Sequence, residues 1–395
     1  MAEKNIQLKD RLKDNTMLLA LVAVVILFQI LIVSSGRGSL LKPANVTNII
    51  SQNAYVLVLA TGMLLCIISG GNIDLSVGSL VCLIGAISGK LIVTAGLNTG
   101  VAIILCLLFG IALGAWQAFW IAYIRISSFI VTLSGMLLFR GIANIILNGM
   151  TISPFPDSYM RVFASYLPGS GSSSNTIFTF SMILGVIACG IYLFNEIHST
   201  NNKKRKGYEY EEGTAQIIKL IVTCLVILWF ASLLARHKGL PVILIWLLII
   251  ITIYSYFTSK TVPGRHFYAM GGNAKATELS GVNTNHILFF AYVNMGFLSA
   301  IAALMCAARF NSVSPSAGTG YEMDAIAACF VGGAGVFGGS GTVLGTVIGA
   351  LFIGVLNNGM SIMGVDANWQ KAVKGLVLLL AVVFDVLSKK KASAK

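Results

Sequence analysis

A single acidic residue, Asp74, lies in a long apolar stretch, inside the decapeptide Gly-Gly-Asn-Ile-Asp-Leu-Ser-Val-Gly-Ser at residues 70–79. Between Pro43 and Gly89 it is the only Asp, Glu, Lys or Arg. A carboxylate that faces lipid at the centre of a membrane helix costs about 2.5–3.5 kcal/mol. The neighbouring glycines favour a break in the helix at this point. The sequence therefore predicts a polar site or a packed junction inside a membrane.

Two roles are open for the polar residues of this segment. The Asp74 carboxylate can accept backbone N–H groups that the glycine break leaves free, or pair with Ser76, and we favour this structural role. Asn72 and Ser76 can instead hydrogen-bond to hydroxyl groups of a solute. Asn53, on the preceding apolar segment, is a weaker candidate. We therefore take Asn53, Asn72, Asp74 and Ser76 as candidate residues of a translocation path.

The composition indicates that these residues belong to an all-α polytopic membrane protein. The 395 residues are 56% hydrophobic and only 10% charged, whereas soluble domains carry about 25% charged residues. The net charge of +13 comes from Lys and Arg that cluster between apolar segments, where membrane topology places them. This distribution argues against nucleic-acid binding and for contact with membrane lipid.

Twelve apolar stretches are long enough to cross about 30 Å of hydrocarbon. They fall near residues 17–34, 53–69, 75–94, 101–124, 127–147, 177–194, 216–235, 240–258, 287–308, 324–341, 343–362 and 371–387. Glycine-rich breaks in the second, third and tenth favour half-helices or re-entrant segments. We therefore expect 10–12 transmembrane helices in one membrane domain over 1–395, and the positions of Lys and Arg place both termini in the cytoplasm.

Two predicted cytoplasmic loops differ from simple connections. Residues 195–215 form a charged linker, and residues 259–286 form a basic loop. In the second loop, Pro263 and Gly264 are expected to end the preceding helix.

A short helix is predicted inside the 259–286 loop. Asn273 can cap a helix over 274–279, and Gly281 can end it. A short capped helix in a basic loop suits docking to a partner. An amphipathic turn on the membrane surface is the alternative, and the residues alone do not decide between them.

A weak internal echo links two glycine pairs. Gly70-Gly71 precedes further glycines in much the same way as Gly338-Gly339 does. Transporters often contain repeats with glycine-interrupted helices at matching positions. Close helix packing produces the same pattern, so both interpretations stay open.

The sequence contains no recognisable catalytic motif. It has no His-Glu-x-x-His, no Gly-x-Ser-x-Gly and no Gly-x-x-x-x-Gly-Lys-Ser/Thr loop. The seven cysteines are dispersed, without metal-binding spacing. Glu322 and Asp324 start an apolar segment and are expected to favour a helix N-terminus. The chain is thus not expected to be an enzyme, to bind ATP by itself or to hold a cofactor.

Three segments carry a resemblance to a known family. They are Gly71-Asn-Ile-Asp-Leu-Ser-Val-Gly78, Gly272-Asn-Ala-Lys-Ala-Thr-Glu-Leu-Ser-Gly281, and the glycine-rich stretch from Gly332 to Gly349. In these segments the chain resembles the permease subunit of the ribose/xylose/galactose group of bacterial ATP-binding-cassette importers. The region 195–258 is longer than in the shorter ribose-type members and is similar to the xylose and multiple-sugar members.

This resemblance implies a transmembrane permease of monosaccharide import in the bacterial inner membrane. Two copies would form the translocation path as a homodimer, a separate cytoplasmic ATP-binding cassette subunit would hydrolyse ATP, and an extracytoplasmic sugar-binding protein would deliver the sugar. The resemblance also implies an ATPase coupling helix, whose residues are Gly272, Asn273, Ala276, Glu278, Leu279, Ser280 and Gly281. Which monosaccharide is carried stays open.

Two rival functions remain. In an ion- or proton-coupled secondary transporter, Asp74 would be the proton or cation site. The second rival is a membrane scaffold or receptor component without transport.

Overall fold

The described part of the chain folds mainly into helices. The computed structural model describes residues 16–169, 173–207 and 214–393, with side chains described for 216–387 of the last range. Within these residues, ten helices are long and apolar enough to cross a membrane. The predicted all-α polytopic membrane protein is thereby confirmed. The lysines of the first fifteen residues and the acidic part of the 195–215 linker lie outside the described residues.

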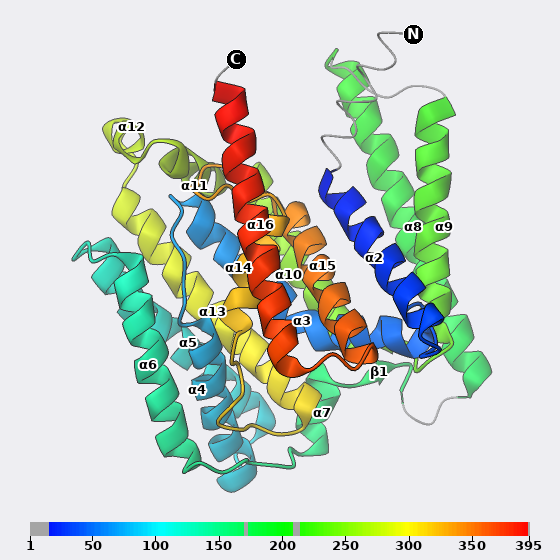
Figure 1. The fold of residues 1–395 in the computed structure, drawn as a ribbon, viewed down its shortest axis with the longest axis horizontal. Coiled ribbons are helices and arrows are strands. Elements are labelled where there is room, and N and C mark those ends of the chain that lie inside the picture. Colours follow the sequence, from blue (N-terminus) through cyan, green and yellow to red (C-terminus); the bar gives the residue numbers. More distant parts are fainter. Residues whose placement is uncertain (1–15, 170–172, 208–213, 394–395) are drawn as a thin grey trace. The chain divides into compact units, whose positions relative to one another are not determined.

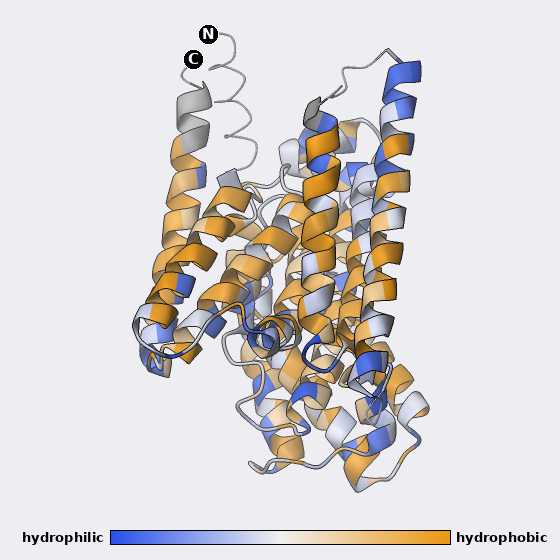
Figure 2. Cartoon of the chain, turned by 90° about the vertical axis from the view of Figure 1, so that its right-hand side faces the viewer, coloured by the Kyte–Doolittle hydropathy of each residue, from blue (hydrophilic) through white to orange (hydrophobic). Residues whose placement is uncertain are grey.

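Ten predicted stretches correspond to these ten helices. They are α2 (Thr16–Ser34), α3 (Pro43–Ile68), α4 (Val77–Gly89) with the π-helical turn η1 (Lys90–Thr94), α5 (Thr99–Ala122), α6 (Ser128–Leu147), α8 (Ser174–Arg205), α9 (Thr214–Ala235), α10 (Val242–Lys260), α13 (Thr284–Phe310) and α15 (Val343–Ile362). The shorter elements are α7 (Asp157–Phe163), α11 (Val262–Gly272), α12 (Ala274–Leu279), β1 (Tyr166–Leu167) and β2 (Leu240–Pro241). Figure 2 shows that the helix middles are mainly apolar and that hydrophilic residues gather at helix ends and connections.

The other two stretches are not among these ten helices. The stretch 324–341 is a half-helix, α14 (Tyr321–Val331), followed by a glycine-rich loop. The stretch 371–387 lies in α16 (Ala367–Ser393), which is helical but carries Lys371, Lys374 and Asp385. By contrast, the stretch 53–69 is part of one unbroken helix, α3.

The 259–286 loop is more helical than the sequence indicated. The helix α10 ends at Lys260, three residues before Pro263, so the predicted break between helices is present. Pro263 and Gly264 themselves lie in the first turn of the next helix, α11, where Thr261 Oγ1 accepts a hydrogen bond from the Gly264 N–H at 3.1 Å. Proline suits a first turn because its missing N–H has no helical partner there.

The chain divides into two compact units. The smaller unit comprises Leu41–Asn48 and Ser165–Val242. In it, α8 packs against α9, and Lys219 forms an ion pair with Glu196 at 2.7 Å. The larger unit comprises Met1–Leu40, Ile49–Ala164 and Ile243–Lys395, and it contains every candidate site described below.

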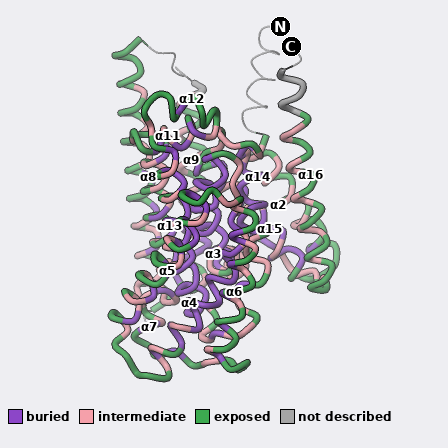
Figure 3. Tube along the Cα trace, turned by 90° about the vertical axis from the view of Figure 1, so that its left-hand side faces the viewer, coloured by how far each residue is buried: buried purple, intermediate pink, exposed green. Residues whose placement is uncertain are grey.

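The core of the larger unit runs along α3, α4 and α13, where Figure 3 shows the buried residues concentrated. Small residues allow α5 and α13 to approach closely. A Cβ at Gly114 would lie 2.6 Å from the Tyr292 carbonyl oxygen. A Cβ at Gly296 would lie 2.3 Å from the Gly110 carbonyl oxygen. Membrane helices associate through such small-residue contacts because lipid supplies no hydrophobic driving force between them.

The two ends of the larger unit are built from different elements. At one end lie α11, α12, the start of α2 and the C-terminal part of α16 (Figures 1 and 3). At the other end lie α7 and the 311–320 loop that joins α13 to α14. The backbone of Ile152 pairs with that of Val313, which ties this loop to the segment before α7.

Candidate functional site

Asp74 and Ser76 form a fully buried cluster in the connection between α3 and α4. The Asp74 Oδ1 atom accepts hydrogen bonds from the Ser76 N–H at 2.8 Å and from Ser76 Oγ at 2.6 Å. The Gln117 amide on α5 donates to Ser76 Oγ at 2.9 Å. A carboxylate that bonds the backbone two residues later forms a local turn, here the one that starts α4. The predicted contact between Asp74 and Ser76 is therefore present.

The other two candidate path residues occupy different surroundings. Asn72 is half-buried, two residues before Asp74. Asn53 is buried on α3, donates its amide to the Ile49 carbonyl oxygen at 2.8 Å, and faces Gly354 of α15. The structure thus brings Asp74 and Ser76 together, whereas Asn53 belongs to the packing of α3 against α15.

The three segments that carry the family resemblance meet at one place. We call it the glycine junction and define it as Gly70–Gly71, Gly271–Gly272 and Gly338–Gly339. The Gly339 N–H donates to the Ile68 carbonyl oxygen at 3.0 Å. A Cβ at Gly271 would lie 1.9 Å from that same oxygen, and one at Gly71 would lie 2.5 Å from the Val336 carbonyl oxygen. At Gly71 and Gly271 backbone thus contacts backbone, with no space for a Cβ.

The two glycine pairs that echo each other in sequence contact each other in this junction. All four glycines have positive φ, from 72° to 128°. A Cβ at Gly338 would lie 2.7 Å from the Gly70 nitrogen. Such φ values are readily accessible to glycine and rare for other residues. Each glycine pair thus lies in a turn with positive φ that precedes a helix, α4 for the first pair and α15 for the second.

The helix α12 forms as the sequence predicted. Its bounds are Ala274–Leu279, and Asn273 Oδ1 accepts a hydrogen bond from the Ala276 N–H at 2.9 Å. Gly281 follows the helix with φ at 88°. These local signals act within a few residues, so the tertiary environment did not have to create them.

The surface of α12 combines one exposed apolar side chain with an ion pair. Leu279 is 77% exposed. Lys275 Nζ lies 3.3 Å from a Glu278 carboxylate oxygen. Ser280 Oγ donates to the Thr277 carbonyl oxygen at 2.7 Å and closes the last turn. A rigid exposed helix of this kind is suited to docking in a groove of another protein.

A buried ion pair joins α14 to α16. The Asp324 carboxylate lies in the first turn of α14, and Lys374 Nζ is 2.9 Å from its Oδ1. The Tyr55 hydroxyl on α3 donates to Asp324 Oδ2 at 2.7 Å. The Tyr55 ring in turn stacks on that of Tyr321, with 3.7 Å between ring centroids. This arrangement fixes the start of the half-helix between α3 and α16.

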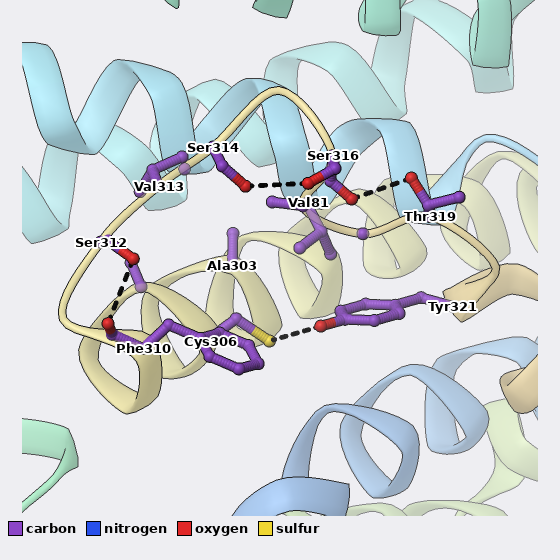
Figure 4. Close-up of a pocket in the computed structure, with 14 residues that line it drawn as sticks. Val81, Ala303, Cys306, Phe310, Ser312, Val313, Ser314, Ser316, Thr319 and Tyr321 are labelled. Carbon is purple, nitrogen blue, oxygen red and sulfur yellow. Dashed lines mark hydrogen bonds between the residues drawn. The ribbon is translucent and has the colours of Figure 1, made fainter. Parts of the chain in front are cut away.

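A pocket of about 320 Å³ lies at the end of the unit opposite α12 (Figure 4). Its walls come from α4, α13, the 311–320 loop and the start of α14. Its lining includes five hydroxyl-bearing residues, namely Ser312, Ser314, Ser316, Thr319 and Tyr321. Ser314 and Ser316 point toward each other with 3.1 Å between their Oγ atoms, and Thr319 Oγ1 donates to the Ser316 carbonyl oxygen at 2.8 Å.

The pocket loop is anchored by α6 and by the Asp74 decapeptide. Arg140 on α6 donates to the Pro315 carbonyl oxygen at 3.1 Å and also to that of Ala317. A Cβ at Gly318 would lie 2.0 Å from the Gly78 carbonyl oxygen. The decapeptide therefore touches the pocket loop at its Gly78 end and the glycine junction at its Gly70 end.

The Lys374–Asp324 ion pair, the Arg140 anchor of the 311–320 loop and the pocket are not predicted by any sequence motif. Arg140 and Lys374 were visible as charges inside apolar stretches, and such charges generally need a partner. Their partners, Asp324 and the carbonyl groups of the 311–320 loop, are remote in sequence. Asp324 was expected only to favour a helix N-terminus. Among the described residues, no group of three or more His, Cys, Asp and Glu side chains is placed to hold a metal ion.

Comparison with known proteins places the chain in a family. Residues 45–382 match the family described as branched-chain amino acid transport system / permease component. The chain is 36% identical to the xylose transport system permease protein of Escherichia coli (strain K12), over 95% of this chain and 93% of that protein. It is 37% identical to the Haemophilus influenzae xylose transport system permease protein, over 95% and 96% of the two chains.

The ribose import permease protein of Escherichia coli (strain K12) is 35% identical, over 93% of this chain and 92% of that protein. No solved structure matches the chain. The match to the family model covers most of the sequence, and the relatives align along nearly their full length. The chain therefore belongs to this family of transport-system permease components.

Proposed function

We propose that the chain is the permease subunit of an ATP-driven monosaccharide importer in the bacterial inner membrane. The observation that carries this proposal is the sequence identity of 36% with a xylose transport system permease protein over 95% of the chain. The names of the xylose and ribose relatives favour a pentose as the transported sugar. In this proposal the whole chain acts as one permease domain and hydrolyses no ATP itself.

The helix α12 is the proposed docking site for a separate cytoplasmic ATPase. Its exposed Leu279 would enter a groove of that partner, and its cap at Asn273 would keep it rigid. Only Gly272 and Asn273 separate α12 from Gly271, which is packed in the glycine junction. A displacement of α12 would therefore reach the connection after α3 and the loop before α15.

The two ends of the larger unit fit opposite sides of the membrane. The start of α2 and the C-terminal part of α16 lie at the same end as α12, which supports cytoplasmic termini (Figure 1). The other end, with α7 and the 311–320 loop, would receive an extracytoplasmic sugar-binding protein. Two copies of the chain would enclose the path as a homodimer within the lipid bilayer.

Within this proposal, the candidate path residues divide by exposure. Asp74 and Ser76 would hold the turn before α4 and keep the decapeptide in place, because both are fully buried and bonded to each other. Asn72 is half-buried and remains available to meet a sugar hydroxyl group. Asn53 would support the α3–α15 contact at the edge of the path.

Reconstitution tests the proposal directly. The purified chain would be placed in liposomes with its genomic-neighbour ATPase and sugar-binding protein, and uptake of labelled xylose, ribose and leucine would be measured. We expect pentose uptake that requires ATP and both partners. Uptake by the chain alone, driven by a proton gradient, would establish the secondary-transporter alternative. Uptake of leucine in preference to both sugars would overturn the assignment of the substrate class.

A further inference from the structure

We propose that the pocket beside the start of α14 is a sugar subsite of the permease itself. We call it the α14 pocket and define it by its lining residues Val81, Ala303, Phe310, Ser316, Thr319 and Tyr321. The inference rests on the proposed function and adds a solute-binding site that none of the sequence motifs indicated. A volume of about 320 Å³ falls at the lower end of the roughly 300–1,000 Å³ typical of small-molecule sites.

The chemistry of the lining suits a neutral polyhydroxyl compound. Side-chain hydroxyl groups both donate and accept hydrogen bonds, as sugar hydroxyl groups do. Ser316 and Thr319 are exposed and bring two such groups to the pocket. The lining residues include no Asp, Glu, Lys, Arg or His. An amino acid zwitterion or an inorganic ion would leave its charges uncompensated here, whereas a sugar would not.

Part of the lining is apolar. It is formed by Val81 of α4 and by Ala303 and Phe310 of α13, which Figure 4 labels. A sugar ring presents C–H groups on its faces and hydroxyl groups around its edge. A pocket with one apolar wall and one hydroxyl-bearing loop is therefore complementary to both parts of the ring. The small number of polar groups predicts weak binding, as a transported solute requires.

The hydroxyl-bearing wall is held in place before any solute arrives. Arg140 fixes two carbonyl groups of the 311–320 loop, and the Gly78–Gly318 contact fixes its far end. On the other side, Tyr321 is stacked on Tyr55, which is bonded to Asp324. A preorganised wall reduces the ordering cost of binding.

The test substitutes Thr319, an exposed residue of the 311–320 loop whose hydroxyl group donates to the Ser316 carbonyl oxygen. Thr319→Val keeps the side-chain shape and removes the hydroxyl group, and Thr319→Trp fills the pocket. Thr151→Val is the matched control, because Thr151 is an exposed threonine beside the Ile152–Val313 bridge but outside the pocket lining. Each variant would be reconstituted with ATPase and binding protein, and the number of xylose molecules moved per ATP hydrolysed would be measured.

We expect this ratio to fall about threefold to tenfold for Thr319→Val, the effect of one lost hydrogen bond. We expect a larger fall for Thr319→Trp and no change for Thr151→Val. Wild-type ratios in both Thr319 variants would overturn the subsite alone. A parallel loss of uptake and ATP hydrolysis, with an unchanged ratio, would also overturn it and assign the loop to docking of the binding protein. A wild-type complex that moves no sugar would overturn the proposed function itself.

Discussion

Removal of the Lys374 ammonium group should strongly destabilise the fold, because it leaves the Asp324 carboxylate buried without a cation. The Asp324 side chain is only 3% exposed and that of Lys374 is 26% exposed. We consider the substitution Lys374→Met, which keeps a long apolar side chain on α16. The matched control is Lys371→Met, one helical turn earlier, where the lysine is exposed.

The structure sets the size of the effect. At the observed 2.9 Å, the gross attraction between unit charges is about 6 kcal/mol for an effective dielectric constant near 20. Desolvation of both groups offsets part of this attraction, and loss of one partner of a buried pair typically costs about 3–5 kcal/mol. Because Lys374 keeps partial access to solvent, we expect a loss near the lower limit, about 3 kcal/mol.

A double-mutant cycle isolates the ion pair from other effects of the substitution. Asp324→Asn removes the charge and keeps an acceptor for the Tyr55 hydroxyl group. The double variant, Asp324→Asn with Lys374→Met, should be more stable than Lys374→Met alone, with a coupling energy of about 2 kcal/mol.

The assay is equilibrium unfolding in mixed detergent micelles as the fraction of dodecyl sulfate rises, followed by circular dichroism. Lys371→Met should change the free energy of unfolding by no more than about 0.5 kcal/mol. Equal stability of Lys374→Met and Lys371→Met, or a coupling energy indistinguishable from zero, would refute a stabilising role for the ion pair.

Three further predictions concern the glycine junction, the buried acid and α12. Gly271→Ala should lower the free energy of unfolding by about 1–3 kcal/mol or prevent folding, because its Cβ would lie 1.9 Å from the Ile68 carbonyl oxygen. The control Gly272→Ala, whose Cβ would have no atom within 4 Å, should unfold like the wild type. Asp74→Asn should retain sugar uptake in cells, because only Oδ1 of Asp74 makes hydrogen bonds to the described residues and an amide oxygen can replace it. Complete loss of uptake in a stably folded variant would favour proton coupling at this residue. Leu279→Asp should reduce co-purification of the ATPase about tenfold or more and leave permease unfolding unchanged, because the side chain is 77% exposed; undiminished co-purification would remove α12 from the docking surface.

Local physics explains why part of this molecule was predictable from its sequence. Hydrophobic length located all ten long apolar helices, because a segment that spans hydrocarbon must be apolar and satisfy its own backbone hydrogen bonds. The bounds of α12 followed from Asn273 and Gly281, since helix capping acts within a few residues. The contact of Asp74 with Ser76 was predictable for the same reason, because only one residue separates them in the sequence.

Tertiary structure decided everything that depends on residues remote in sequence. Asp324 pairs with Lys374, 50 residues later, and with Tyr55, 269 residues earlier. The α14 pocket joins residues of α4 to the loop after α13, and the glycine junction joins three segments of the chain. The sequence showed that Asp74 needed a built environment, because a membrane does not solvate a carboxylate. Only the packing of the helices revealed that the segment around Asp74 contacts both the 311–320 loop and the glycine junction next to α12. Such contacts depend on how the helices pack against one another and not on local propensity.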